Sequence, residues 1–123
     1  MLTDRLKTSA LCLFCAVALA AQLFALASLP FELAEPWDKL FHCLAYASLT
    51  LLAWIALDGR RPLAVTMGVM ALAFADELCQ GFVAARGADL TDFLAGALAA
   101  GMTGVLLYRN TGEKKSCVES SPQ

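Results

Sequence analysis

Four long apolar blocks dominate the chain. They cover residues 11–29, 40–57, 63–78 (or 63–82 when the acids near its end are included) and 93–108, and each is roughly 16–20 residues long. A helix needs about 20 residues to cross the roughly 30 Å hydrocarbon layer of a membrane. Because lipid offers no partner for open backbone groups, such blocks must be helices. The pattern predicts an all-α, four-helix transmembrane bundle with short loops, its helices at about 9–29, 40–57, 63–82 and 90–108.

Composition agrees with this prediction. The chain has 123 residues, of which 59% are hydrophobic and 16% are charged. That length leaves room for one domain, and the chain is too apolar for a soluble protein of this size. We expect one membrane domain over residues 1–109 and a polar, disordered cytoplasmic tail over residues 110–123. No glycine-rich nucleotide motif follows a predicted strand, and we expect no nucleic-acid partner.

Basic residues are distributed unevenly between the two sides of the predicted bundle. Seven of the nine Lys and Arg residues lie on one side: two before the first helix, two in the 58–62 turn and three after the last helix. Only Lys39 and Arg86 lie on the other side. The positive-inside rule predicts that both termini are cytoplasmic (N-in, C-in). A cleaved signal peptide is the alternative for the first helix, because Ala25-Leu26-Ala27 resembles a cleavage site, although the apolar run is longer than usual.

Two polar runs, at residues 38–46 and 76–92, interrupt the apolar pattern on the outward side. Within each run the polar residues recur at three- and four-residue steps, so they share a helix face. Ionisable groups inside a membrane are costly and mark candidate functional sites. We expect the two runs to meet in an outward-facing polar pocket. The candidate ligand-binding residues are Asp38, Lys39, His42, Tyr46, Asp76, Glu77, Gln80, Arg86 and Asp92.

The spacing of these residues resembles that of the VanZ-like family of small bacterial membrane proteins. The family is named for a member associated with resistance to the glycopeptide teicoplanin. The shared patterns are Asp38-Lys39-x-x-His42-x-x-x-Tyr46 and Asp76-Glu77-x-x-Gln80-x-Phe82-x-x-x-Arg86-x5-Asp92. The resemblance covers the second to fourth helices. It implies a multi-pass protein of the bacterial inner (cytoplasmic) membrane that acts in the cell envelope, and it implies no defined reaction.

Two interpretations of the polar pocket involve no chemical reaction. In the first, the polar groups form an interhelical network that fixes the register of the bundle, and Asp92 is a simple helix cap. In the second, Lys39 and Arg86 hold the phosphate of a membrane lipid, as basic pockets between membrane helices do. Recognition of a lipid-linked or glycopeptide-related envelope component is the leading functional prediction.

Two further interpretations assign an activity to the pocket. The chain can be a hydrolase or transferase acting on such a lipid, with His42, Asp76 and Glu77 as candidate catalytic residues. Alternatively, the polar stripe lines a path for protons or small solutes, but no charged residue continues deeper into the second or third helix. Whether the protein is an enzyme stays open.

Several of the same residues are potential metal ligands. His42, Asp76, Glu77 and Asp92 carry suitable nitrogen and oxygen ligands. Because the two basic residues of the polar runs can neutralise these acids, the sequence predicts no metal site and no cofactor.

Overall fold

The computed structural model describes residues 2–26, 37–82 and 89–119, and it describes side chains over residues 2–23, 37–82 and 89–111. Its elements are α1 (Asp4–Leu26), α2 (Trp37–Ala56), α3 (Pro62–Phe82) and α4 (Leu90–Glu119). All four helices are long and apolar enough to cross a membrane. The predicted all-α, four-helix transmembrane bundle is therefore confirmed, and the chain is a multi-pass membrane protein.

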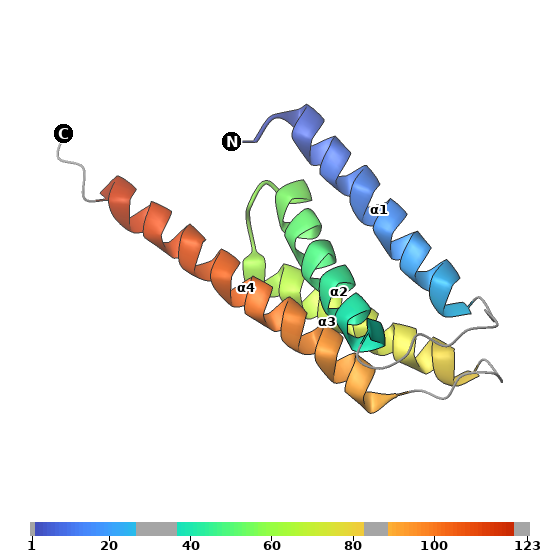
Figure 1. Ribbon diagram of the computed structural model, residues 1–123. Coiled ribbons are helices and arrows are strands. Elements are labelled where there is room, and N and C mark those ends of the chain that lie inside the picture. Colours follow the sequence, from blue (N-terminus) through green and yellow to red (C-terminus); the bar gives the residue numbers. More distant parts are fainter. Residues whose placement is uncertain (1, 27–36, 83–88, 120–123) are drawn as a thin grey trace.

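The helix α2 lies at the centre of the bundle (Figure 1). It packs most extensively against α4, then against α1, and less against α3, which itself packs on α4. The chain's N-terminal segment, the α2–α3 turn and the end of α4 lie toward one end of the bundle. The start of α2, the end of α3 and the start of α4 lie at the other end, which we call the polar end (residues 37–46, 76–82 and 89–96).

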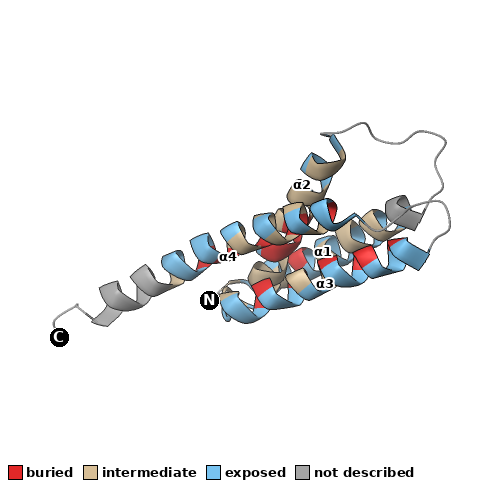
Figure 2. Ribbon diagram, turned by 90° about the horizontal axis from the view of Figure 1, so that it is seen from below, coloured by how far each residue is buried: buried red, intermediate tan, exposed pale blue. Residues whose placement is uncertain are grey.

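The core is small and apolar. Its buried cluster consists of Tyr46, Leu49, Val69, Ala73 and Ala100. Burial is concentrated on the facing sides of α3 and α4, and the outer surfaces are exposed (Figure 2). Because these outer surfaces carry many large apolar side chains, they suit contact with lipid tails.

Small residues bring α4 close to its neighbours. Ala100 is fully buried, and a Cβ added at Gly104 would collide with the side chain of Thr66 on α3. Small residues four apart allow helix backbones to approach closely in a membrane. Ala100 and Gly104 are such a pair, and they let α4 lie close against α3.

A compact turn, residues 57–61, connects α2 to α3 and also contacts the start of α1. The Gly59 N–H donates to the Trp54 carbonyl at 2.9 Å and the Asp58 N–H to the Ile55 carbonyl at 3.0 Å. With Asp58 in the left-handed region (φ 62°), this is the Schellman arrangement that ends many helices. The Asp58 carboxylate accepts the Leu2 N–H at 2.9 Å and lies 3.3 Å from the Lys7 ammonium. These contacts hold the beginning of the chain against the turn.

The helix bounds differ from the prediction at both ends of the chain. Helix α1 begins at Asp4 and α2 at Trp37, before the apolar blocks start. An acid in the first turn favours the positive end of a helix, and counting apolar residues alone omits such polar turns. Helix α4 continues to Glu119, so the expectation of a disordered tail is wrong over residues 110–119. That stretch contains the helix formers Glu113, Lys114 and Lys115. Residues 120–123 lie outside the described part.

Candidate functional site

Asp76 on α3 joins three helices through hydrogen bonds. The Tyr46 hydroxyl of α2 donates to Asp76 Oδ2 at 2.8 Å, and the Gln22 amide of α1 donates to Asp76 Oδ1 at 2.8 Å. Asp76 and Tyr46 are each only 4% exposed. Buried carboxylates are stable when their oxygens accept hydrogen bonds. Both oxygens of Asp76 are therefore hydrogen-bonded, and the residue links α1, α2 and α3.

Gly96 on α4 leaves space for the Tyr46 side chain that bonds to Asp76. A Cβ added at Gly96 would lie 2.5 Å from Cδ2 of the Tyr46 ring, much closer than real Cβ contacts. Glycine at this position therefore lets the aromatic ring lie directly against the α4 backbone. Through Tyr46, all four helices meet at one level of the bundle.

Glu77, the neighbour of Asp76, contacts the start of α4. Asp89 caps this helix, because its Oδ1 accepts both the N–H and the hydroxyl of Thr91 at 2.8 Å. In a capping box, Asp92 would reach back to the Asp89 N–H. Instead, Glu77 Oε2 on α3 accepts that N–H at 3.1 Å. Asp89, rather than Asp92, thus caps the start of α4.

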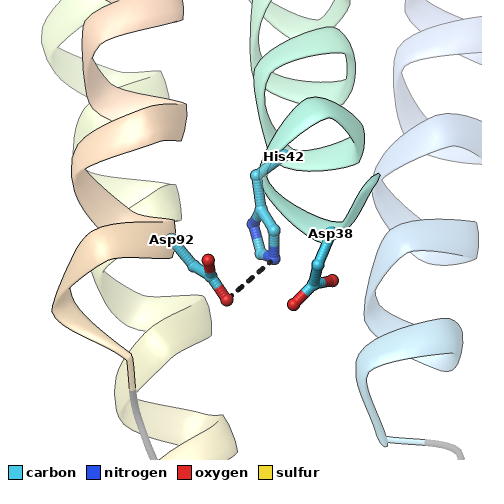
Figure 3. A group of neighbouring side chains, drawn as sticks. All are labelled: Asp38, His42 and Asp92. Atoms are coloured by element: carbon cyan, nitrogen blue, oxygen red, sulfur yellow. Dashed lines mark ion pairs between the residues drawn. The ribbon is translucent and has the colours of Figure 1, made fainter. Parts of the chain in front are cut away.

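With that N–H taken by Glu77, Asp92 faces α2 instead. Its Oδ2 lies 3.9 Å from His42 Nε2, and its Oδ1 lies 3.9 Å from Lys39 Nζ. Asp38 lies on the other side of the His42 ring from Asp92 (Figure 3). These residues come from the first two turns of α2 and the first turn of α4. We call Asp38, His42 and Asp92 the acid–histidine cluster.

Two buried acid oxygens at the polar end have no hydrogen-bond partner within the described residues. They are Oε1 of Glu77 and Oδ1 of Asp92. Glu77 is 6% exposed and Asp92 is 7% exposed. Leaving a buried acceptor unsatisfied costs about 1–3 kcal/mol, and more for a charged group. These oxygens therefore have unused capacity for a donor or a cation, in contrast to Asp76.

His42 contacts both Tyr46, which is hydrogen-bonded to Asp76, and the other residues of the acid–histidine cluster. Its ring stacks on Tyr46 with centroids 6.1 Å apart and an interplanar angle of 21°. The edge of the ring meets Phe41, with centroids 6.5 Å apart. Aromatic contacts of this kind restrict the ring. His42 is thereby held with Nε2 directed toward Asp92.

Most of the residues predicted for the pocket do come together at the polar end. The described members are Asp38, Lys39, His42, Tyr46, Asp76, Glu77, Gln80 and Asp92. Gln80 is buried one turn beyond Asp76 on α3. Arg86 lies outside the described residues. The candidate catalytic residues divide between two groups, because Asp76 is bound to Tyr46 and Gln22, whereas the acid that faces His42 is Asp92.

Gln22 is the site residue that the sequence analysis did not identify. It is half-buried on α1 and bonds to Asp76. The available signal was a single amide inside an otherwise apolar block, where an unpaired polar group would be costly. Its partner could not be inferred from spacing, because the two residues lie on different helices.

Comparison with protein-family models, with curated proteins and with solved structures finds no match for this chain. The indications of function therefore come from the geometry of the polar end and from the spacing of its polar residues.

Proposed function

We propose that the chain is a VanZ-like protein of the bacterial inner membrane whose polar end binds the head group of a lipid-linked envelope component. The observation that carries this proposal is the pair of buried acid oxygens, Glu77 Oε1 and Asp92 Oδ1, that lack hydrogen-bond partners within the described residues. Sugar hydroxyls, amide N–H groups and ammonium groups are the donors that such oxygens accept. Head groups built from sugars and peptides carry all three.

The position of the unsatisfied oxygens favours a lipid as the bearer of those donors. Both acids lie within helices that can span a membrane, close to the helix ends. An open apolar groove of about 520 Å³ runs along the outer side of α4 from Leu94 to Leu106, with Met70 of α3 at its edge. Its first residue, Leu94, follows Asp92 by two positions, so the groove lies on the opposite side of α4 from Asp92. The exposed apolar side chains around the bundle, rather than this groove alone, would contact the hydrocarbon chain of a lipid whose head group enters the polar end.

Lys39 supplies positive charge for the phosphate of such a lipid. Its Nζ is 3.9 Å from Asp92, beyond hydrogen-bond distance, and its side chain is 31% exposed. Basic residues near the ends of membrane helices commonly contact lipid phosphates. Arg86, outside the described residues, is the second basic residue that the sequence assigns to this side.

Lipid retention tests the proposal. The wild type and the variants Asp92→Asn and Lys39→Gln are purified from bacterial membranes, and bound phospholipid and polyprenyl-phosphate species are quantified by mass spectrometry. We expect one lipid class to be enriched with the wild type and depleted from both variants. Asp4→Asn is the control, because it makes the same change at a 98% exposed side chain at the opposite end. Equal lipid profiles for all four proteins would contradict the proposal.

An enzyme acting on the same lipid is the second candidate, and one observation favours it. His42 Nε2 faces the Asp92 carboxylate at 3.9 Å. A histidine beside a carboxylate can act as a general acid or base when substrate brings the groups together. The discriminating result is a chemically changed lipid that accumulates with the wild type and not with His42→Gln, while binding of the unchanged lipid is retained.

A further inference from the structure

We propose that Asp38, His42 and Asp92 bind a divalent metal ion at the polar end. Each residue offers one ligand atom, and these atoms all lie within 4.8 Å of one another. Figure 3 shows the three side chains converging from α2 and α4. The site goes beyond head-group recognition and does not depend on it. It also revises the expectation, drawn from the sequence, that the chain has no metal site.

The state of Asp92 provides a second observation that points to a ligand. Its side chain is 10% exposed, and its Oδ1 has no hydrogen-bond partner among the residues that the structure describes. The carboxylate is directed toward the ring of His42 and the space beside Asp38 (Figure 3). A buried carboxylate is normally hydrogen-bonded, paired with a cation at close range, or bound to a metal. Lys39 forms an ion pair with Oδ1 at 3.9 Å, beyond hydrogen-bond distance, so this oxygen has a cation nearby but no hydrogen-bond donor among the described residues.

The charge balance around His42 also favours a cation. Five carboxylates interact electrostatically with one another or with His42: Asp38, Asp76, Glu77, Asp89 and Asp92. Among the described residues, Lys39 is the basic side chain that lies beside these acids. Like charges in a partly buried region repel strongly. A doubly charged ion bound between them would offset most of this repulsion.

The ligand atoms fit a transition-metal ion better than calcium or magnesium. Zinc binds histidine nitrogen and carboxylate oxygen at about 2.0–2.2 Å. An ion between His42 Nε2 and Asp92 Oδ2, which are 3.9 Å apart, can therefore reach both atoms. One imidazole with two carboxylates is a mixed set that suits zinc, manganese or ferrous iron, whereas calcium and magnesium prefer oxygen alone. Three protein ligands would leave a position for water.

Lys39 is the rival partner of Asp92, and the two possibilities predict opposite effects. If Lys39 is the permanent counter-ion of Asp92 and no metal binds, Lys39→Gln removes this ion pair and does not create a metal site. If a metal binds, Lys39 competes with it for the carboxylate. Lys39→Gln should then tighten metal binding, because the competing positive charge is gone.

The test measures metal binding by the full-length protein in detergent. The chain is stripped with a chelator and then titrated with zinc and, separately, with manganese, using equilibrium dialysis and elemental analysis. We expect about one ion per chain for the wild type, with binding weakened by at least about tenfold in Asp92→Asn and in His42→Gln. We expect no change in Asp4→Asn, whose acid lies at the opposite end. Asp38→Asn, at a half-buried position, provides a third ligand variant if either buried change prevents folding.

Cobalt substitution adds a spectroscopic readout. Nitrogen and oxygen ligands should give visible d–d bands without the thiolate charge-transfer band that binding to Cys43 or another cysteine would produce. A wild type that binds neither zinc nor manganese, or a stoichiometry and affinity unchanged in all three ligand variants, would overturn the proposal. Bound lipid is measured on the same stripped protein. A failure of the metal proposal can then be distinguished from a failure of the lipid proposal.

Discussion

The Tyr46 hydroxyl of α2 donates a 2.8 Å hydrogen bond to Asp76 of α3, and both residues are 4% exposed. Gln22 of α1 satisfies the second oxygen of the same carboxylate. One turn further toward the end of the bundle, Asp92 lies beside His42 with an oxygen that has no hydrogen-bond partner in the described part of the chain. The two acids thus differ, because both oxygens of Asp76 accept hydrogen bonds, whereas Asp92 has one oxygen that accepts none from the described residues.

Removing the Tyr46 hydroxyl should weaken the bundle. Tyr46→Phe leaves Asp76 Oδ2 buried without its donor, so we expect the free energy of unfolding to fall by about 1–3 kcal/mol. Reversible unfolding in mixed detergent micelles measures the change. Tyr108→Phe is the matched control, because Tyr108 is 65% exposed and its change should have little effect. Equal stabilities for the two variants would mean that the Tyr46–Asp76 bond contributes nothing.

Adding one methyl group at Gly96 should also destabilise the protein. Its Cβ would lie 2.5 Å from the Tyr46 ring, and inserting atoms into a packed site typically costs about 1–3 kcal/mol. Gly68→Ala makes the same change on α3, where no atom lies within 4 Å of the added Cβ. We expect that control to be neutral or slightly stabilising, because alanine favours helices more than glycine. Thermal unfolding of the two variants compares them, and the same loss in both would show that packing against Tyr46 is irrelevant.

The contact between the start of the chain and the α2–α3 turn should depend on pH. The Leu2 N–H, and to a lesser extent Lys7, holds the pKa of Asp58 below its ordinary value of 3.8. The unfolded or detached chain therefore takes up this proton at a higher pH than the folded chain. The stabilisation is complete above pH 3.8 and is lost as the pH falls through the lowered pKa.

The Leu2 amide resonance reports on this contact. In a titration by NMR in detergent, we expect it to move only below the ordinary pKa of Asp58. Asp58→Asn should abolish that movement, because the titrating group is gone. A Leu2 resonance that titrates identically in the variant would show that another group controls the contact.

The orientation in the membrane is a further prediction. The chain's N-terminal segment and the α2–α3 turn share one end of the bundle, and that end carries most of the basic residues. The positive-inside rule assigns it to the cytoplasm. A green fluorescent protein fused after Gln123 should fluoresce, and alkaline phosphatase fused at the same position should be inactive. The reverse pattern would place the polar end on the cytoplasmic side.

Much of the fold could be predicted from the sequence because membrane helices are defined by the length of apolar blocks. The four helices were expected, and α3, expected over 63–82, spans Pro62–Phe82. Block counting did not find the polar first turn at Asp4 or the extension of α4 to Glu119. Both depend on helix propensity and end effects rather than on hydrophobicity.

For the site, the sequence predicted which end of each helix carries the polar residues, but not which residues of different helices contact each other. Three- and four-residue spacing correctly grouped the polar residues of α2 and of α3 at one end. Spacing along each helix does not say which residues of two helices meet: packing pairs Asp76 with Tyr46 and brings His42, one turn nearer the start of α2, to Asp92. Rotation depends on packing, including the space that Gly96 leaves for Tyr46, and a single sequence does not specify it.

The most direct test of the two roles measures two properties of the same two variants. Asp76→Asn and Asp92→Asn each replace one buried acid with its amide, and both the free energy of unfolding and the amount of retained lipid are determined. We predict that Asp76→Asn lowers stability, because the amide cannot accept from both Gln22 and Tyr46. We predict that Asp92→Asn leaves stability unchanged or raises it, while the retained lipid is lost. A stability loss in Asp92→Asn as large as in Asp76→Asn, with lipid content unaltered, would show that the polar end is a structural network and would contradict the account.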